Sequence, residues 1–323
     1  MTFRILALVP AFVLLSFAAS TQAAVEQLIA VSTPTGELHG SLMLPDAGKS
    51  QTVALIIAGS GPTDRDGNNP MTRNDSLKLL ATALAQDGIA TVRYDKRGVG
   101  ASAAALTDES KLVFHDLVAD AQAWVKLLLG DPRFPNVVII GHSEGATIGL
   151  LVARAGEARA YVSIAGPAQS APQILRSQLR GRLPPELAQT NEKILTTLES
   201  GQSVQDVPPA LMTLYRPSVQ PYLIDWFRIV PTEAIRDLRV PCLLVQGDTD
   251  IQLPVQAAQS LHAANPATEL VIVEGMNHVL KLVPNEQSKQ LASYRDPSLP
   301  LAPALSVSIV RFIRAQTGGT AGS

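Results

Sequence analysis

The sequence contains one cysteine among its 323 residues and has no run of basic side chains. Because Cys242 has no partner cysteine, we expect no internal disulfide, so the hydrophobic core must stabilise the fold. The net charge is −2, and charged residues make up only 17% of the chain. This charge distribution has none of the features of a nucleic-acid-binding surface, and we expect no nucleic-acid partner.

Motifs for metals and nucleotide cofactors are also lacking. No histidine and cysteine cluster has the spacing of zinc ligands, and neither His262 nor His278 has a partner at such spacing. The acidic segment 64–69 departs from a calcium loop, which needs glycine at position six. We expect Asx-type turns there instead, ordering the neighbouring glycine-rich segment. Residues 98–100 (Gly-Val-Gly) lack the third glycine of a dinucleotide motif. The sequence therefore predicts no metal and no cofactor.

The first 23 residues have the features of a secretory signal peptide. One positive charge at Arg4 precedes an almost wholly apolar run over 5–19, and small residues follow it. The run is short for a membrane-spanning helix, which needs about 20 residues. We expect cleavage after Ala23 or Ala24, export to the periplasm or medium, and no stable membrane insertion of the mature protein. An uncleaved membrane anchor is the alternative.

Apolar, β-branched runs alternate with segments of helical periodicity along most of the chain. A hairpin over 27–44 precedes them. This alternation is typical of parallel strands joined by crossover helices, so we predict an α/β fold with a mostly parallel, doubly wound sheet. The strands are expected at 53–58, 89–94, 137–140, 161–165, 242–246 and 270–273, and the helices at 76–86, 115–129, 144–154, 255–264 and 304–315.

The alternation is interrupted between residues 167 and 237. This segment has no apolar strand, but proline-punctuated stretches within it have helical character. A structureless loop of that length is uncommon in a compact domain. We therefore predict a helical lid insertion at 167–237, with the α/β core formed by 24–166 and 238–323. Its helices are expected at 171–180, 185–198, 210–215 and 221–229.

A predicted strand runs into the segment GHSEG at 141–145, which fits the pattern G-x-S-x-G. This pattern forms a nucleophile elbow, a sharp strand-to-helix turn that holds the serine in a strained conformation. Residues two positions before and after the serine crowd each other, so Gly141 and Gly145 must be small. The turn exposes the hydroxyl of Ser143 at the carboxyl edge of the sheet, where ligands bind in such folds. It also directs the backbone N–H of Glu144 toward a reacting carbonyl.

A serine hydroxyl is a weak nucleophile and needs a general base that a carboxylate orients. With such an elbow, the chain order is serine, acid, histidine. His278 follows the last predicted strand, in a loop at the carboxyl edge, and is the expected base. His39 and His115 precede the serine, and His262 lies within a predicted helix. His142 is adjacent to the serine and is expected to point elsewhere.

The acid should follow the strand before that of the histidine, where two aspartates compete. The strand at 242–246 ends in Gly247, followed by Asp248 and Asp250. Asp250 is far enough along to clear the strand and turn back toward the histidine. Asp248 directly follows the glycine and is better suited to capping the turn. We therefore predict Asp250 as the acid, with Asp248 as the alternative.

An oxyanion hole needs a second backbone N–H, from the loop after the strand at 53–58. That loop is GSGP at 59–62, whose glycines allow the backbone to approach a substrate closely. We predict that the N–H of Ser60 pairs with the N–H of Glu144. The loop at 59–62 is called the oxyanion loop below.

Together these motifs resemble the α/β-hydrolase superfamily, over roughly 30–316. The closest likeness is to serine-aminopeptidase-like and carboxylesterase-type members with a helical lid. In RYDKRGVGAS at 93–102, the resemblance implies that Arg97 links neighbouring loops structurally. The segments similar to the family's oxyanion loop, acid loop, histidine loop and lid are 59–62, 247–250, 277–278 and 167–237.

The resemblance and the expected triad predict a serine hydrolase that acts on a small-molecule acyl substrate, and a carboxylic-ester hydrolase is the main hypothesis. A peptidase is the first alternative, because exopeptidases of this fold bind a free amine, often through acidic lid residues. Glu186, Glu192 and Glu199, or Glu144 beside the nucleophile, are the candidates for that role, although each also suits a solvated surface. A thioesterase or acyltransferase has the same core, and a non-catalytic binding protein of this fold is the remaining alternative. The sequence does not predict an oligomeric state.

Overall fold

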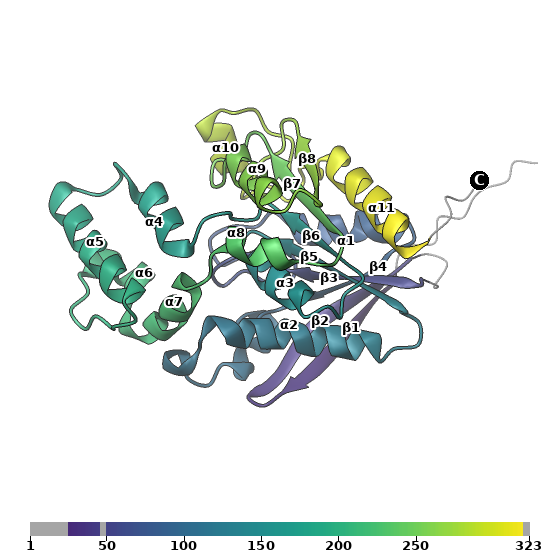
Figure 1. The fold of residues 1–323 in the computed structure, drawn as a ribbon, viewed down its shortest axis with the longest axis horizontal. Coiled ribbons are helices and arrows are strands. Elements are labelled where there is room, and N and C mark those ends of the chain that lie inside the picture. The colour runs from purple at the N-terminus through teal and green to yellow at the C-terminus, as the bar shows by residue number, and fades with distance from the viewer. Residues whose placement is uncertain (1–24, 46–49, 319–323) are drawn as a thin grey trace, which may run out of the picture.

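The computed structural model describes residues 25–45 and 50–318. The predicted signal peptide lies outside these residues. An eight-stranded sheet runs through the centre of the molecule, in the order β1-β2-β4-β3-β5-β6-β7-β8 (Figure 1). The pairs from β4 to β8 are parallel, and the β1–β2 and β2–β4 pairs are antiparallel. The strands are β1 (Val25–Thr33), β2 (Gly36–Leu44), β3 (Thr52–Ile57), β4 (Ala90–Tyr94), β5 (Asn136–His142), β6 (Ala160–Ile164), β7 (Cys242–Gly247) and β8 (Glu269–Val273).

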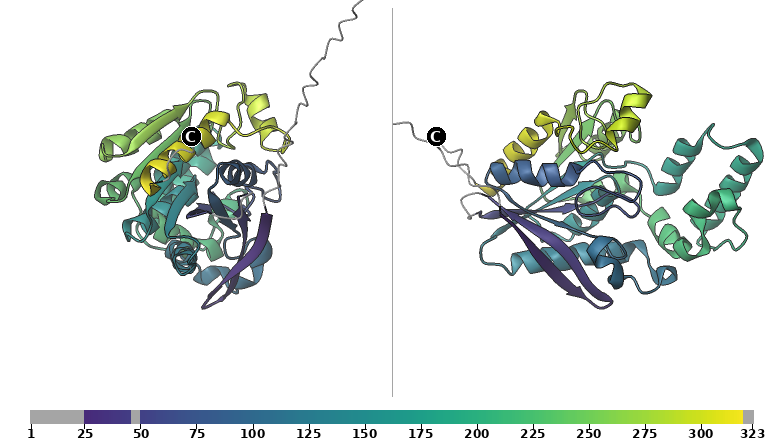
Figure 2. Two further views of the ribbon diagram at one scale, coloured as in Figure 1. Left: turned by 90° about the vertical axis from the view of Figure 1, so that its right-hand side faces the viewer. Right: turned by 180° about the vertical axis from the view of Figure 1, so that it is seen from behind.

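Helices cover both faces of this sheet (Figures 1 and 2). Alternate side chains of the buried strand β3 point to opposite faces, so Leu55 packs in one hydrophobic cluster and Ile56 in the other. The cluster with Leu55 includes residues of α2, α3 and α9, and the one with Ile56 includes residues of α1 and α11. The predicted doubly wound α/β fold is therefore confirmed. The bounds are α1 (Ser76–Gln86), α2 (Phe114–Leu129), α3 (Glu144–Arg154), α9 (Val255–Ala264), α10 (Gln287–Ser293) and α11 (Pro303–Thr317).

The segment between β6 and β7 forms a helical insertion at the carboxyl edge of the sheet (left in Figure 1). It has a hydrophobic core of its own, which includes Leu195, Leu198 and Tyr215. Ile229 and Ile235, near its end, instead pack in the core of the sheet domain. The helices are α4 (Ala171–Leu179), α5 (Pro185–Glu199), α6 (Met212–Tyr215), α7 (Gln220–Phe227) and α8 (Pro231–Ala234), with 3-10 turns at Pro209–Leu211, Pro217–Val219 and Ile235–Asp237.

Arg97, in the loop after β4, links separate parts of the core. Its guanidinium donates to Oδ2 of the buried Asp120 on α2 at 2.7 Å, and to Oγ1 of Thr35 in the β1–β2 turn at 3.2 Å. The charge-assisted bonds raise the pKa of Arg97. These contacts confirm the structural role that the family resemblance implies for this arginine.

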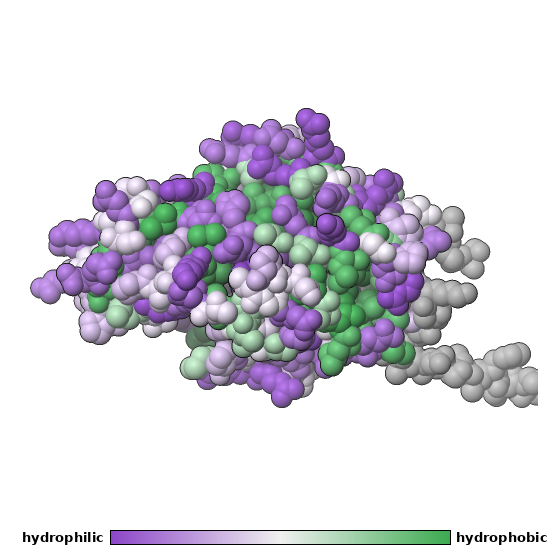
Figure 3. All heavy atoms as spheres, turned by 90° about the horizontal axis from the view of Figure 1, so that it is seen from below, coloured by the Kyte–Doolittle hydropathy of each residue, from purple (hydrophilic) through white to green (hydrophobic). Residues whose placement is uncertain are grey.

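The hairpin and the end of α2 carry exposed hydrophobic side chains, and hydrophobic residues gather on this side of the molecule (Figure 3). Leu28, Leu127 and Leu129 are exposed there, beside a groove lined by Ile29 and Phe134. This groove lies near the start of β5, whose other end carries the candidate serine. No helix within 25–45 and 50–318 has the length and apolar character needed to span a bilayer.

Candidate active site

The strand order places the expected catalytic loops side by side. The chain moves from β3 to its neighbour β4 in one direction, and then crosses back over β3 to reach β5. The order thus reverses between β3 and β5, and such switch points form the ligand crevice in open α/β sheets. The oxyanion loop follows β3, and Ser143 follows β5. The topology therefore brings these two predicted elements to one crevice.

Ser143 has the backbone conformation expected of a nucleophile elbow. Its φ is 56° and its ψ is −120°, which is strained for a residue with a Cβ atom. A Cβ atom at Gly141 would lie 2.2 Å from the carbonyl oxygen of Gly145. A Cβ atom at Gly145 would lie 2.2 Å from the carbonyl oxygen of Ile57 on β3. Both positions therefore require glycine, and at Gly145 the crowding comes from the neighbouring strand, which the sequence argument did not anticipate.

His278 and Asp250 lie against each other at the same edge of the sheet. Nδ1 of His278 is 2.8 Å from Oδ2 of Asp250, and both side chains are buried. The backbone N–H groups of Gln252 and Leu253 donate to the other carboxylate oxygen, Oδ1, at 2.7 and 3.0 Å. Burial acts to raise the pKa of Asp250, but His278 and the N–H donors outweigh it and hold the pKa below its ordinary value. An ionised Asp250 can only accept, so Nδ1 of His278 carries the proton and Nε2 is left to act as a base.

Asp248 has a different environment from Asp250. Its Oδ1 accepts a hydrogen bond from the backbone N–H of Gly275 at 2.6 Å. Beside it, the N–H of Thr249 donates to the carbonyl of Met276 at 3.2 Å. These bonds tie the acid loop to the loop that carries His278. Asp248 thus has the turn-capping contacts that the sequence suggested, while Asp250 contacts the histidine.

His142 was expected to point away from the site, and this expectation is wrong. Its Nε2 lies 2.9 Å from the backbone carbonyl of His278, and the two rings are 4.9 Å apart. Burial, with a further contribution from His278, lowers the pKa of His142 to about 3, so the ring is neutral at physiological pH. Because a carbonyl only accepts, Nε2 of His142 must donate. The side chain beside the nucleophile thereby positions the backbone of the expected base.

The two predicted oxyanion donors lie on either side of Ser143. Glu144 is the first residue of α3, so its backbone N–H has no acceptor within the helix and lies at the positive end of the helix dipole. The oxyanion loop passes close to the nucleophile, because a Cβ atom at Gly59 would lie 3.2 Å from Cβ of Ser143. Ser60 itself is exposed. The backbone of this loop is therefore close enough to contact a carbonyl that the serine attacks.

The side chain of Glu144 is buried, contrary to the suggestion that it faces solvent. Its Oε1 accepts from Nζ of Lys96 at 3.1 Å, and its Oε2 accepts from the hydroxyl of Tyr222 at 2.8 Å. Lys96 follows β4 and also donates to the backbone carbonyl of Gly59 at 2.5 Å. Sequence reasoning missed Lys96 and Tyr222. The position of Lys96 directly beyond a buried strand, at the carboxyl edge, was the one available signal.

The acidic segment next to the oxyanion loop forms the predicted Asx-type turns. Oδ1 of Asp64 accepts from the backbone N–H groups of Asp66 and Asn68, both at 2.9 Å. Arg65 pairs with the buried Asp95 at 2.7 Å, which ties the segment to the loop after β4. Within residues 25–45 and 50–318, no group of three or more acidic, histidine or cysteine side chains is arranged to hold a metal ion. The segment thus orders the loop through protein contacts.

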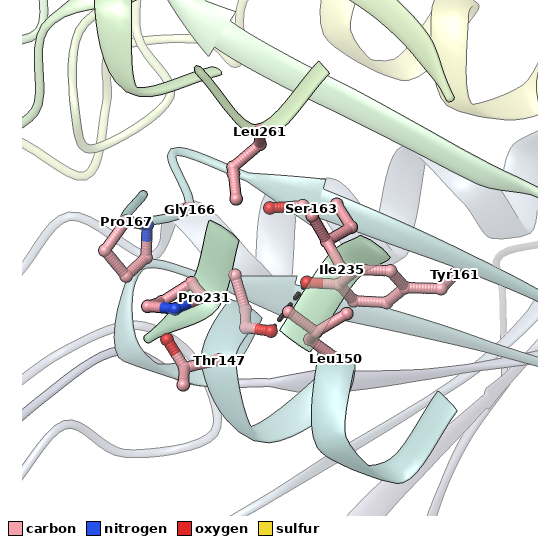
Figure 4. Close-up of a pocket in the computed structure, with 10 residues that line it drawn as sticks. Thr147, Leu150, Tyr161, Ser163, Gly166, Pro167, Pro231, Ile235 and Leu261 are labelled. Atoms are coloured by element: carbon pink, nitrogen blue, oxygen red, sulfur yellow. Dashed lines mark hydrogen bonds between the residues drawn. The ribbon is translucent and has the colours of Figure 1, made fainter. Parts of the chain in front are cut away.

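A small cavity lies behind the elbow, between α3, β6 and α8 (Figure 4). Thr147 and Leu150 line it from α3, and Ser163 lines it from β6. Its volume of about 10 Å³ matches that of a single water-sized probe. The hydroxyl of Tyr161 donates to the carbonyl of Ala146 at 2.6 Å at its edge. An acyl group is too large for this cavity, so it is not the substrate site.

Comparisons with known proteins agree with this architecture. The model of the Alpha/beta hydrolase family matches residues 67–293, and the chain therefore belongs to the α/β-hydrolase family. Among curated proteins it is similar to the esterase EstD of Thermotoga maritima, with 26% identity over 248 residues. That match covers 75% of this chain and 58% of EstD, so the chain spans less than two thirds of its relative's length.

Solved structures show the same fold. Est1E from Butyrivibrio proteoclasticus with bound ferulic acid superposes with a TM-score of 0.63 and 17% identity, covering 90% of this chain and 99% of Est1E. The esterase Pf2001 of Pyrococcus furiosus superposes with a TM-score of 0.58 and 15% identity, covering 90% and 93% of the two chains. At these identities the likeness establishes the fold and leaves the substrate to chemical argument.

Proposed function

We propose that the protein is a serine hydrolase of carboxylic esters, with Ser143 as nucleophile, His278 as general base and Asp250 as the orienting acid. The observation that carries the proposal is the buried contact between His278 and Asp250, at 2.8 Å, on the same sheet edge as the strained Ser143. A nucleophile, a base and an oriented carboxylate are the three groups that acyl transfer through a serine requires.

The reaction follows from these positions. His278 takes the hydroxyl proton of Ser143 as the serine oxygen attacks the ester carbonyl. The N–H groups of Ser60 and Glu144 donate to the oxyanion that forms. His278 then gives the proton to the leaving alcohol, which departs and leaves an acyl-enzyme. Water, deprotonated by the same imidazole, attacks the acyl-enzyme and releases the acid.

Ester hydrolysis is favoured over aminopeptidase activity by the state of the candidate amine-binding carboxylates. Glu192 and Glu199 both pair with Arg176 within the helical insertion, at 2.7 and 2.6 Å. Both oxygens of Glu144 already accept hydrogen bonds. The similar proteins named above are described as esterases, and one of them holds ferulic acid. We therefore propose a small ester as the substrate.

A substrate panel tests this proposal. The purified protein is expected to hydrolyse p-nitrophenyl esters, while aminoacyl p-nitroanilides remain intact, because the amine-binding carboxylates are already occupied. Release of p-nitrophenol or p-nitroaniline is followed by absorbance, with Ser143→Ala protein as the baseline. A series of increasing acyl-chain length then ranks the acyl site. Anilide cleavage would instead identify a peptidase, and inactivity on every substrate would favour a non-catalytic protein of this fold.

We also propose that the protein is exported and that its signal is removed. The support is the charge at Arg4 followed by the apolar run over 5–19 and the small residues after it. Expressed from the full sequence, the mature chain is expected to begin at Ala24 or Val25, after cleavage behind Ala23 or Ala24. N-terminal sequencing of the protein recovered from the periplasm or medium is the measurement. A chain that keeps Met1 and sediments with membranes would indicate an anchor.

A further inference from the structure

A chain of buried polar contacts connects the helical insertion to the oxyanion loop. It begins at the hydroxyl of Tyr222 on α7, which donates to Oε2 of Glu144 at 2.8 Å. The other oxygen of Glu144 pairs with Nζ of Lys96 at 3.1 Å, and Nζ also donates to the carbonyl of Gly59 at 2.5 Å. The side chains of Lys96 and Glu144 are only 5% and 3% exposed, so water does not screen this pair.

The contact at Gly59 determines where the neighbouring N–H points. The carbonyl of Gly59 and the N–H of Ser60 belong to one planar peptide unit, and in a trans peptide they point in opposite directions. The described residues contain no cis peptide. When Nζ of Lys96 holds the oxygen of this unit on one side, the N–H of Ser60 is directed to the other. Lys96 therefore orients one of the two proposed oxyanion donors without touching the substrate.

Glu144 links this contact to the second donor. Its backbone N–H is the other proposed oxyanion donor, and its carboxylate is the partner of Lys96. A buried ion pair keeps a defined geometry only when its remaining hydrogen-bonding atoms are also satisfied. Tyr222 satisfies the second carboxylate oxygen. Without that hydroxyl, one oxygen of a buried carboxylate loses its donor, and the position of the pair becomes less well defined.

Tyr222 is itself held at the junction between the insertion and the sheet domain. Its ring lies 5.7 Å from that of Phe114 on α2 and 5.7 Å from that of Trp226 on α7, and Phe114 and Trp226 stack at 5.6 Å. Beside this cluster, Oδ2 of Asp225 accepts from the backbone N–H of His115 at 2.9 Å. Burial and the charge of Glu144 raise the pKa of Tyr222, so its hydroxyl stays protonated and can donate.

We propose that Tyr222, acting through Glu144 and Lys96, is a positioning residue for the oxyanion hole, so that the docked helical insertion orders the site. This inference rests on the hydrolase function proposed above. It predicts that the hydroxyl of Tyr222 contributes to stabilising the transition state and contributes little to binding the ground-state substrate. The effect should therefore appear in kcat and leave KM nearly unchanged.

The test compares two tyrosine-to-phenylalanine variants. Tyr222→Phe removes the hydroxyl that contacts Glu144. Tyr215→Phe removes a hydroxyl of the same insertion that donates to Asn191 at 2.8 Å within the insertion's own core, and it serves as the matched control. Two quantities are measured: kcat and KM on the best ester, and the second-order rate of Ser143 labelling by a fluorophosphonate. The labelling reaction also develops charge on an oxygen in the oxyanion hole, and it does not depend on knowing the substrate.

Tyr222→Phe is expected to lower both kcat and the labelling rate about tenfold, while KM stays within about twofold, because it loosens a donor without removing it. Tyr215→Phe should match the wild type in both measurements. The acid limb of the kcat pH profile should not move, since His278 and Asp250 are untouched. A Lys96→Met/Glu144→Leu double variant, in which apolar groups replace the ion pair, gives a second test: adding Tyr222→Phe to it should change the labelling rate no further.

The outcomes separate this inference from the proposed function. If Ser143 is labelled in the wild type and Tyr222→Phe behaves like Tyr215→Phe, the positioning role is wrong and the hydrolase proposal stands. A loss that appears only in KM also overturns the positioning role, since it would place Tyr222 in substrate binding. If the wild type is not labelled, or if Ser143→Ala protein is labelled equally, the hydrolase proposal fails, and this inference fails with it.

Discussion

Ester turnover by a Ser143→Ala variant is expected to fall about 10⁴- to 10⁶-fold in kcat, as it does when the nucleophile of a serine hydrolase is removed. The change deletes one oxygen atom and leaves His278 and Asp250 without a group to activate. The oxyanion donors are backbone N–H groups, so they remain and account for the residual rate. The measurement is steady-state hydrolysis of the best p-nitrophenyl ester, together with a burst experiment that detects the acyl-enzyme.

The interpretation needs evidence that the variant is folded. Its thermal midpoint should stay close to that of the wild type, because alanine keeps the same Cβ atom and the strained φ of 56°. Ser308→Ala on α11, where the hydroxyl donates only to the Ala304 carbonyl of its own helix, is the matched control and should keep full activity. Residual turnover by Ser143→Ala above about 1% of the wild-type rate would identify another nucleophile or a contaminant.

Much of the core could be predicted because its signals are local. The helices predicted at 76–86, 144–154 and 255–264 have those bounds in the structure, since their apolar spacing and the glycines, prolines and turns beside them are explicit in the sequence. Helix α10 (287–293) was missed. Its one large apolar side chain, Leu291, is exposed, so the segment has no apolar stripe to identify.

The polar contacts of the site were much less predictable. Lys96 and Glu144 are 48 residues apart, and Tyr222 is 78 residues from Glu144. No periodicity relates such positions, and their meeting depends on how the helical insertion packs on α2. A glutamate at the start of a helix is ordinarily exposed, which is why solvent exposure was considered for Glu144. The order of the chain indicated which loops meet, but not which side chains within them make contact.

Asp250→Asn is expected to lower kcat about 10³- to 10⁴-fold, because asparagine presents an amide donor as well as an acceptor to Nδ1 of His278. The neutral side chain no longer favours the proton on Nδ1 or stabilises the imidazolium, so Nε2 is less available as a base. KM and kcat are measured on the best ester over a range of pH. The folded state holds the pKa of Asp250 below its ordinary value, so its ionised form contributes stability at neutral pH that is lost as the pH falls. The variant should lack this contribution to the pH dependence of its thermal midpoint.

Asp248→Asn is the matched control, two residues away in the same loop. Asparagine keeps an Oδ1 that can accept from the N–H of Gly275, so the turn should persist and kcat should stay within about threefold of the wild type. The pair of variants distinguishes the two aspartates by chemistry instead of by position. A large loss in Asp248→Asn with a small loss in Asp250→Asn would reassign the acid, and would mean that the 2.8 Å contact with His278 is not the orientation used in catalysis.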